Sequence, residues 1–444
     1  MKLTLKKFTV LCFLWIYLLS VLPMLTIAAQ AMPELKSKSA MVVDSVNGQI
    51  LHAENVDTLM EVGGVSKVLL LYLVADSINQ GTITAQDPVA ISDKAYELSQ
   101  DYGIQNVPLR QDFQYSVEEL MEAVVVTGAN GATLALAEHV AGDEKKALKM
   151  MAQTLEKWGI HQYKFVNVTG LPQGLVPHQT DTYEKGAVNK MTAQACAIAT
   201  YQLIQKYPKI LNDAKQPTAT LKKDSEDPYE MTNTIAMIED NDYAYKGTTG
   251  LMLGTSKKDG DSAIITAERN HLPVISIILG TQKRGEGQRY HESKKILDYI
   301  FAMYVMQDVV KKEQKVTEIG QIKVKDGVKD TVEINYQTPY QMAMPVVGKR
   351  PRLTYEFIPN EKIVHQQNTL HAPVKKGQTI GQVQVTIDKK HVAYLPTAKG
   401  NRVDIQTAEV IAEAPWYQKG WNNFTQTIHN SWEATRVFFT NLFN

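Results

Sequence analysis

Residues Gly64 to Val74 read GVSKVLLLYLV. The run from Val68 to Val74 is apolar throughout, and its length and flanks predict a buried helix. Positions three apart share one face of a helix, so this pattern places Gly64 beside the amine of Lys67. Ser66 is one residue from Lys67 and two from Gly64, so its hydroxyl is expected to point elsewhere around the helix.

Two later stretches have similarly distinctive patterns. Residues 123–138 read AVVVTGANGATLALAE, an apolar segment that is interrupted at Gly128 and Asn130 before a second helical pattern begins. Residues 250–256 read GLMLGTS and precede two strand patterns. A shorter stretch with threonines between glycines, GTTG, lies just before it at residues 247–250.

From residue 40 to residue 300 the chain resembles the serine D-alanyl-D-alanine carboxypeptidases, which are low-molecular-weight penicillin-binding proteins. That family uses the motifs Ser-x-x-Lys, Ser-x-Asn and Lys-Thr-Gly. Residues 250–256 match the family's GLKTGTS at five of seven positions, which favours them over residues 247–250 as the third motif. The positions that then correspond to the motifs are Gly64, Lys67, Gly128, Asn130, Met252, Leu253 and Gly254.

The resemblance implies that the groups that perform the family's chemistry are missing. Gly64 stands at the position of the nucleophilic serine, and Gly128 at that of the serine that relays protons. Met252 and Leu253 replace the lysine and threonine, and apolar side chains cannot pair with the substrate's terminal carboxylate. We therefore expect a catalytically inactive member of the family that binds a peptidoglycan stem peptide or cell-wall synthesis proteins.

Two alternatives remain open from the sequence. The chain could be an active D-alanyl-D-alanine carboxypeptidase that trims stem peptides with another nucleophile, such as Ser66 or Ser256. It could also be a structural spacer whose cleft has no role. Labelling with a fluorescent penicillin distinguishes the enzyme from the other two.

The periodicity predicts a mixed fold of helices and strands, α/β (α+β). Two strand patterns flank the hairpin signal Asn47-Gly48 near the start, and two more lie at residues 263–267 and 274–279. Helical patterns lie between them, at residues 65–79, 116–126, 131–141, 144–157 and 192–206, and a last helix is expected near residues 291–311. This order predicts an antiparallel sheet flanked by helices, as in penicillin-binding and β-lactamase-like domains.

The domain organisation follows from changes in pattern along the chain. Residues 1–31 are predicted to be a signal peptide, because lysines precede an apolar stretch and Ala29-Gln30-Ala31 suits cleavage. Residues 32–312 are expected to form the carboxypeptidase-like domain, and residues 315–413, with short β-runs, a small β-sandwich. Residues 415–444 are expected to form an amphipathic helix whose apolar face lies on a membrane surface. The apolar face of this predicted helix consists of Trp421, Phe424, Ile428, Trp432, Thr435, Phe439 and Leu442.

Composition limits the function classes further. The 47 basic residues balance the 47 acidic residues, so no nucleic-acid partner is expected. Cys196 is the only cysteine outside the signal peptide, and the histidines show no metal-ligand spacing, so neither a metal nor a cofactor is expected. We expect an exported protein at the outer face of the cytoplasmic membrane, in a Gram-positive cell envelope. An uncleaved N-terminal anchor is the alternative for the first segment.

Overall fold

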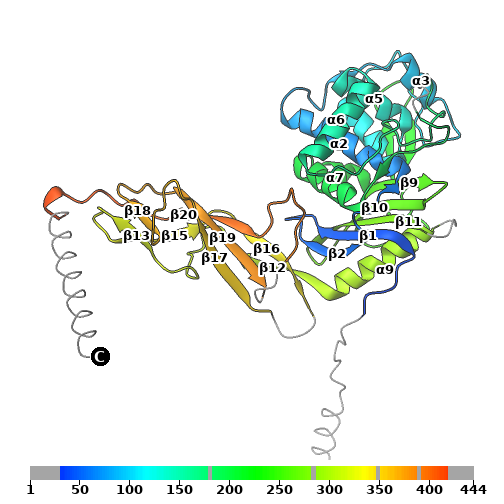
Figure 1. Ribbon diagram of the computed structural model, residues 1–444. Coiled ribbons are helices and arrows are strands. Elements are labelled where there is room, and N and C mark those ends of the chain that lie inside the picture. The colour runs from blue at the N-terminus through cyan, green and yellow to red at the C-terminus, as the bar shows by residue number, and fades with distance from the viewer. Residues whose placement is uncertain (1–30, 179–182, 282–286, 347–350, 388–391, 419–444) are drawn as a thin grey trace, which may run out of the picture.

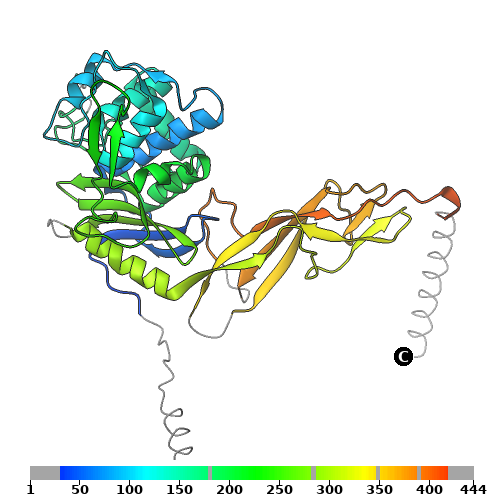
Figure 2. The same ribbon diagram turned by 180° about the vertical axis from the view of Figure 1, so that it is seen from behind.

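The computed structural model describes residues 31–178, 183–281, 287–346, 351–387 and 392–418. Its first part is built on a five-stranded antiparallel sheet with the strand order β2-β1-β11-β10-β9. Figures 1 and 2 show a helical region on one face of this sheet and the helix α9 on the other. The strands are β1 (Ser37–Asp44), β2 (Ile50–Glu54), β9 (Thr248–Ser256), β10 (Gly260–Arg269) and β11 (Leu272–Thr281).

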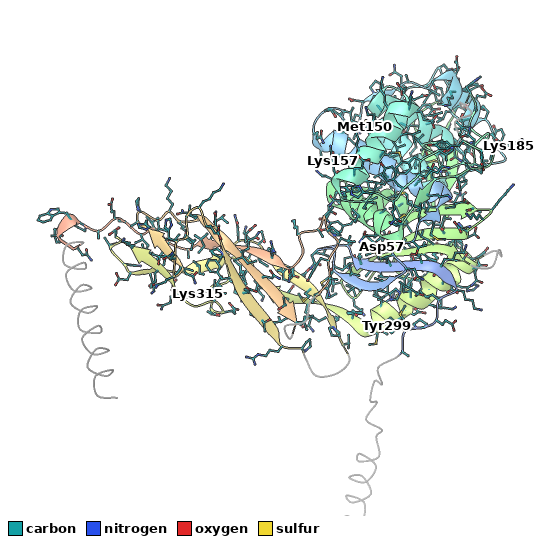
Figure 3. All side chains as sticks on the ribbon, viewed as in Figure 1. Asp57, Met150, Lys157, Lys185, Tyr299 and Lys315 are labelled. Atoms are coloured by element: carbon teal, nitrogen blue, oxygen red, sulfur yellow. The ribbon has the colours of Figure 1, made fainter. Side chains whose placement is uncertain are left out.

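Strand β1 is buried on both faces because it lies inside the sheet between two apolar layers. Met41 and Val43 belong to the core cluster under the helical region, whereas Ala40 and Val42 belong to the cluster under α9. This alternation follows from the two-residue period of a strand. In Figure 3, which has the same view as Figure 1, Met150 of α6 lies on one side of the sheet and Tyr299 of α9 on the other.

The helical region is centred on α2 (Lys67–Asn79), in which every residue from Lys67 to Ala75 is buried. Helix α4 (Val117–Thr127) begins with the expected capping box, since Ser116 accepts from the backbone of Glu119 and the Glu119 carboxylate accepts in return. The remaining helices are the 3₁₀ helix η1 (Gly63–Ser66), α3 (Asp93–Ser99), α5 (Asn130–Ala141), α6 (Glu144–Lys157), α7 (Ala193–Lys206), α8 (Ile210–Ala214) and α9 (Gln288–Met303).

Three short two-stranded ribbons edge the helical region. They pair β3 (Met60–Glu61) with β6 (Lys190–Met191), β4 (Pro88–Val89) with β5 (Tyr115–Ser116), and β7 (Thr218–Leu221) with β8 (Tyr229–Thr232). The antiparallel sheet and the hairpin at Asn47-Gly48 agree with the sequence prediction, as do α2, α4, α5, α6 and α7, whereas α3 and α8 were not predicted.

The second part of the chain is rich in β structure and has its own buried apolar cluster. It contains a four-stranded sheet in the order β15-β20-β19-β17 and a three-stranded sheet in the order β14-β13-β18, in which β13 and β18 are parallel. The strands are β12 (Tyr304–Val310), β13 (Ile322–Lys325), β14 (Thr331–Val332), β15 (Ile334–Tyr336), β16 (Tyr340–Pro345), β17 (Leu353–Pro359), β18 (Thr369–His371), β19 (Thr379–Ile387) and β20 (Arg402–Thr407).

The expectation of one helix near residues 291–311 was partly wrong. Helix α9 ends at Met303, and the chain continues directly as β12, which pairs with β16. The segment from Tyr304 to Val310 carries β-branched and aromatic residues, and its pairing with a distant strand overrides the helical pattern. Residues 1–30 of the predicted signal peptide and residues 419–444 of the predicted amphipathic tail lie outside the described residues.

The two parts meet at the turn between β1 and β2. Asn47 Nδ2 donates to the carbonyl of Gln341 at 2.7 Å, and Gln49 exchanges two hydrogen bonds with the backbone of Ala343 at 2.9 and 3.1 Å. The backbone of Gly48 and Ile50 also pairs with residues 393–395, which follow β19. The first hairpin of the sheet therefore forms the joint with the β-rich part.

Candidate functional site

The site lies where η1 and the start of α2 approach the edge strand β9. A Cβ atom placed on Gly64 would lie 2.8 Å from the carbonyl oxygen of Leu253 and 3.1 Å from the Nζ atom of Lys67. The structure thus brings Gly64, Lys67 and Leu253 together. A contact of 2.8 Å with a backbone atom is shorter than a side chain can occupy without a shift of the chain.

Lys67 is a buried amine. Its side chain is buried with only 2% of the residue exposed, and no hydrogen bond or ion pair reaches it from the residues that the structure describes. Burial lowers the pKa of Lys67 from 10.5 to about 7, because the charged form loses its hydration without gaining a partner. The amine is therefore substantially neutral at physiological pH.

The backbone of η1 packs directly on the backbone of β9. A Cβ atom on Gly254 would lie 2.0 Å from the carbonyl oxygen of Val62, and one on Gly63 would lie 2.6 Å from that of Thr255. Both positions therefore require glycine, since only glycine allows two backbones to approach this closely. Residues 247–250 place no glycine against η1, because a Cβ atom on Gly247 would meet the backbone of Glu268 and one on Gly250 would meet the side chain of Ala214, whereas Gly254 of residues 250–256 packs on η1.

Met252 and Leu253 project to opposite faces of β9. Met252 is 3% exposed and belongs to the core cluster under the helical region, whereas Leu253 is partly buried and packs against the cluster under α9. Neither side chain offers a charge or a hydrogen bond to a carboxylate. Arg289 of α9 approaches this strand, where it donates to the carbonyl of Gly254 at 3.0 Å and pairs with Asp261 at 2.8 Å.

Gly128 ends α4 in the left-handed region, with φ of +72°. A Cβ atom on Gly128 would lie 2.7 Å from Oε1 of Gln105, a residue of the loop between α3 and β5. The carbonyl of Gln105 also accepts from the backbone and the side chain of Asn130, at 3.0 and 2.8 Å. Gln105 therefore occupies the space beside Gly128. The Oδ1 atom of Asn130 is buried and accepts no hydrogen bond from the residues that the structure describes.

The hydroxyls of Ser66 and Ser256 are held in structural hydrogen bonds. Ser66 donates to the carbonyl of Gly63 at 2.9 Å and accepts from Asn189 Nδ2 at 2.7 Å, and it is fully buried. Ser256 donates to the Glu61 carboxylate at 2.5 Å and accepts from two backbone amides that follow it. Neither hydroxyl contacts the amine of Lys67.

Three residues that shape the site were not identified from the sequence. Gln105, Asn189 and Arg289 come from a loop, a segment before α7 and the start of α9, and each lies tens of residues or more from the position that it contacts. No local pattern distinguishes them. The paired glycines at Gly63 and Gly64 are a signal that could have indicated the close backbone approach.

The described residues contain neither a cluster suited to a metal ion nor a helix suited to spanning a membrane. Between residues 31 and 418, apart from the undescribed gaps, no group of three or more His, Cys, Asp and Glu side chains is arranged to hold a metal ion. In the same part of the chain, every helix is too short or too polar to cross a bilayer.

Two family models match the chain in succession. Residues 26–283 match the D-alanyl-D-alanine carboxypeptidase model of the S11 peptidases. Residues 304–409 match the C-terminal domain of penicillin-binding protein 5. The first match covers more than half of the chain and includes η1, α2, α4, α5 and β9.

Individual relatives are distant but extend over nearly the whole chain. The D-alanyl-D-alanine carboxypeptidase DacF of Bacillus subtilis is 22% identical over 389 residues, which is 88% of this chain and 91% of the relative. The carboxypeptidase DacA of Haemophilus influenzae is 24% identical over 404 residues, with 89% and 90% covered.

Solved structures show the same architecture. A peptidoglycan synthesis regulatory factor (PBP3) from Streptococcus pneumoniae is 27% identical, with a TM-score of 0.73 over 85% of this chain and all of that one. Penicillin-binding protein 5 of Haemophilus influenzae is 23% identical, with a TM-score of 0.65 over 86% and 99% of the two chains.

Proposed function

This chain belongs to the D-alanyl-D-alanine carboxypeptidase family, and within that family we propose that it is a catalytically inactive member that binds or scaffolds in peptidoglycan metabolism. The observation that carries this proposal is the backbone contact at Gly64. The space that a nucleophilic side chain would need is bounded by the carbonyl of Leu253 at 2.8 Å and by the Lys67 amine at 3.1 Å.

The chemistry of the family needs an oxygen that attacks the peptide carbonyl. Gly64 has no side chain, and the hydroxyls of Ser66 and Ser256 hold the backbone and neighbouring side chains in place. In a serine protease, loss of the nucleophile lowers turnover by roughly a million-fold. The Lys67 amine remains, but it has no hydroxyl to activate.

Loss of the other two groups supports the same proposal. Gln105 fills the space beside Gly128, and Met252 and Leu253 offer no cation on β9. A stem peptide bound at this edge would bury its terminal carboxylate against apolar side chains, which is unfavourable. We therefore favour a role in which the folded domain is recognised by, or recognises, a component of the cell wall machinery.

One of the solved relatives supports a role of this kind. The Streptococcus pneumoniae structure is described as a peptidoglycan synthesis regulatory factor. For this chain we propose an analogous regulatory role in which its partner is a cell-wall synthesis protein or a stem peptide whose terminal carboxylate lies away from this edge.

We propose the following organisation for the exported protein. Residues 1–31 are a signal peptide, residues 32–312 and 315–413 form the two folded domains, and residues 415–444 hold the protein at the outer face of the cytoplasmic membrane. The aromatic spacing of the tail supports this attachment. A chain that ends at Glu413 should then be released from the membrane fraction, whereas a chain that still sediments with membranes would point to an uncleaved N-terminal segment.

The catalytic part of the proposal is tested with a penicillin. The protein lacking residues 1–31 should form no covalent adduct with a fluorescent penicillin and should release no D-alanine from a pentapeptide. An active carboxypeptidase serves as the positive control. An adduct detected by intact mass spectrometry would support the active-enzyme alternative, and peptide mapping would identify the nucleophile.

A further inference from the structure

The strand β17 forms one edge of the four-stranded sheet in the β-rich part. It pairs with β19 from Leu353 to Pro359, and Figure 1 shows the two strands side by side. The opposite edge strand, β15, is covered by residues 313–316, since the amide of Val316 donates to the carbonyl of Ile334 at 2.9 Å. No segment of the described chain covers β17 in this way. An open edge strand presents unpaired backbone groups that can bind a further strand.

The backbone of β17 alternates between groups that face β19 and groups that face outward. The amide of Asn360 donates to the carbonyl of Ile380 at 2.9 Å, in the same register as the rest of the pair, so the even-numbered residues face β19. Pro359, which has no N–H, then lies at an outward position, as is usual for proline on an edge strand. The other outward backbone groups of the strand belong to Leu353, Tyr355 and Phe357. Within the part of the chain that the structure describes, no hydrogen bond is made to them.

The side chains of β17 separate into an apolar face and a polar face. The apolar face, which packs on the buried cluster of the β-rich part, consists of Leu353, Tyr355 and Phe357. The polar face carries Thr354 and Glu356, and Arg352 precedes the strand on the same face. Arg352 and Glu356 are both exposed. The open edge therefore carries one positive and one negative charge, with Thr354 midway between them.

This arrangement of charges is complementary to itself. When two copies of β17 lie antiparallel with Thr354 opposite Thr354, Arg352 of each copy lies opposite Glu356 of the second copy, so two ion pairs can form. In the same register Leu353 lies opposite Tyr355, and because both face outward they can exchange backbone hydrogen bonds. A register centred on Glu356 would instead oppose two carboxylates, and one centred on Tyr355 would form neither ion pair. Charge and apolar pairing thus favour the register centred on Thr354.

We propose that two copies of this protein associate through β17, antiparallel and in the register centred on Thr354. Their four-stranded sheets then form one continuous sheet, with a two-fold axis that passes between the two Thr354 residues. The contact is confined to one strand and is smaller than a standard interface, so the dimer is weak, with a Kd of roughly 10–100 μM. This inference concerns the β-rich part and is independent of whether the carboxypeptidase-like part is inactive.

Disulfide crosslinking tests the register directly. Cys196 is buried and is the only cysteine of residues 32–444, so a cysteine introduced at the edge is the reactive one. Thr354→Cys places two thiols opposite each other at a separation that a disulfide can bridge, and mild oxidation should give a covalent dimer on a non-reducing gel. The matched control is Thr331→Cys, which changes a threonine that is also partly buried and lies on the edge strand β14. It should give at least about tenfold less dimer. Preferential crosslinking of Tyr355→Cys would overturn the register.

Exchange of the two charges tests the ion pairs. Glu356→Arg places like charges opposite each other, and it should raise the Kd of the dimer at least about tenfold, as measured by sedimentation velocity of residues 32–444. Arg352→Glu should have the same effect. The combination of Arg352→Glu and Glu356→Arg restores the pairs with their signs reversed, and its Kd should lie within about threefold of the wild-type value. The control Glu230→Arg changes an exposed carboxylate on β8 and should leave the Kd unchanged.

Three outcomes would overturn the proposal. The first is a wild-type protein that stays monomeric up to about 300 μM. The second is association that is unchanged in Glu356→Arg, which would place the contact elsewhere, for example in the tail. The third is failure of the double charge exchange to restore association while its circular dichroism matches that of wild type, because the ion pairs would then not determine the contact. None of these results depends on the reaction with penicillin, so the proposed function is tested separately.

Discussion

Gly64 in η1 faces the side chain of Lys67 at the start of α2, so that a Cβ atom placed on Gly64 would lie 3.1 Å from Nζ of Lys67. In a helix this spacing places a side chain and an amine next to each other. Here the carbonyl of Leu253 closes the remaining side at 2.8 Å. The packing around residue 64 therefore leaves too little room for a side chain.

Restoring the serine should disturb this packing. We expect Gly64→Ser to lower the free energy of unfolding by about 1–3 kcal/mol, because the new side chain overpacks the contact between η1 and β9. Gly103→Ser, in an exposed loop, is the control and should change stability by less than about 0.5 kcal/mol. Denaturant unfolding measures both. The Gly64→Ser protein should still form no penicillin adduct, and acylation by this single change would show that the groups missing at Gly128, Met252 and Leu253 are not needed.

Gly128 offers a test of the role of Gln105. Gly128 and Gly81 have the same φ of +72°, but a Cβ atom on Gly81 would meet nothing within 4 Å. Gly81→Ser should therefore show only the backbone cost of a left-handed residue, about 1 kcal/mol. Gly128→Ser should cost more, and Gln105→Ala should remove the difference in a double-mutant cycle. Equal costs at the two glycines would mean that Gln105 moves away freely.

The buried amine of Lys67 is expected to make stability depend on pH. Its folded pKa is lowered from 10.5 to about 7, so the folded state holds fewer protons than the unfolded state between these values. Wild-type stability should then rise with pH across this window, whereas Lys67→Met lacks the effect. We expect Lys67→Met to be more stable than wild type by about 3 kcal/mol near neutral pH, and most of this difference to disappear by about pH 10. A difference that stays constant with pH would contradict a buried unpaired amine.

The buried carboxylate of Asp44, at the joint between the two parts, is expected to make stability change with pH in the opposite direction. It is fully buried, and its carboxylate accepts from the amides of Val46, Asn47 and Gln49. Burial is the largest effect and raises the pKa of Asp44 from 3.8 to about 6, so the folded state holds more protons than the unfolded state between these values. Wild-type stability should therefore fall as pH rises through this window.

The variant Asp44→Asn isolates this effect. Its stability relative to wild type should improve by about 2–3 kcal/mol between about pH 4 and about pH 7. Thermal unfolding at the two pH values measures the change. The neighbouring tyrosines that face Asp44, Tyr201, Tyr340 and Tyr394, all have a raised pKa and stay neutral throughout, so they do not confound the comparison. A relative stability that is the same at both pH values would place the Asp44 carboxylate in contact with water.

The fold was largely predictable because its signals are local. The apolar run after Lys67, the Ser116 capping box and the turn at Asn47-Gly48 each specify an element within a few residues. The end of α9 was not predictable, since the strand pairing of Tyr304 to Val310 depends on β16, some forty residues away. Tertiary pairing decides between helix and strand in such a segment.

The candidate site was predictable only in part, for a similar reason. The residues at the motif positions can be read from three short stretches, and the structure brings Gly64, Lys67 and Leu253 into contact. The site is closed by the contact between the backbones of η1 and β9 and by the side chain of Gln105. Gln105 is positioned by its loop, and no repeat in the sequence identifies it. Spacing along a chain carries no information on such contacts.

The pairing of β1 with β11 also has a consequence for the order of folding. Residues 37–44 pair with residues 274–281, so the central strands of the sheet cannot join until well over half of the chain has been synthesised. The helices between them are held by hydrogen bonds within each helix and can form early, but they must wait for the strand on which they pack. Pairing between strands so far apart in the sequence slows folding. The edge of the β1–β2 hairpin stays exposed until β11 has been synthesised and pairs with β1.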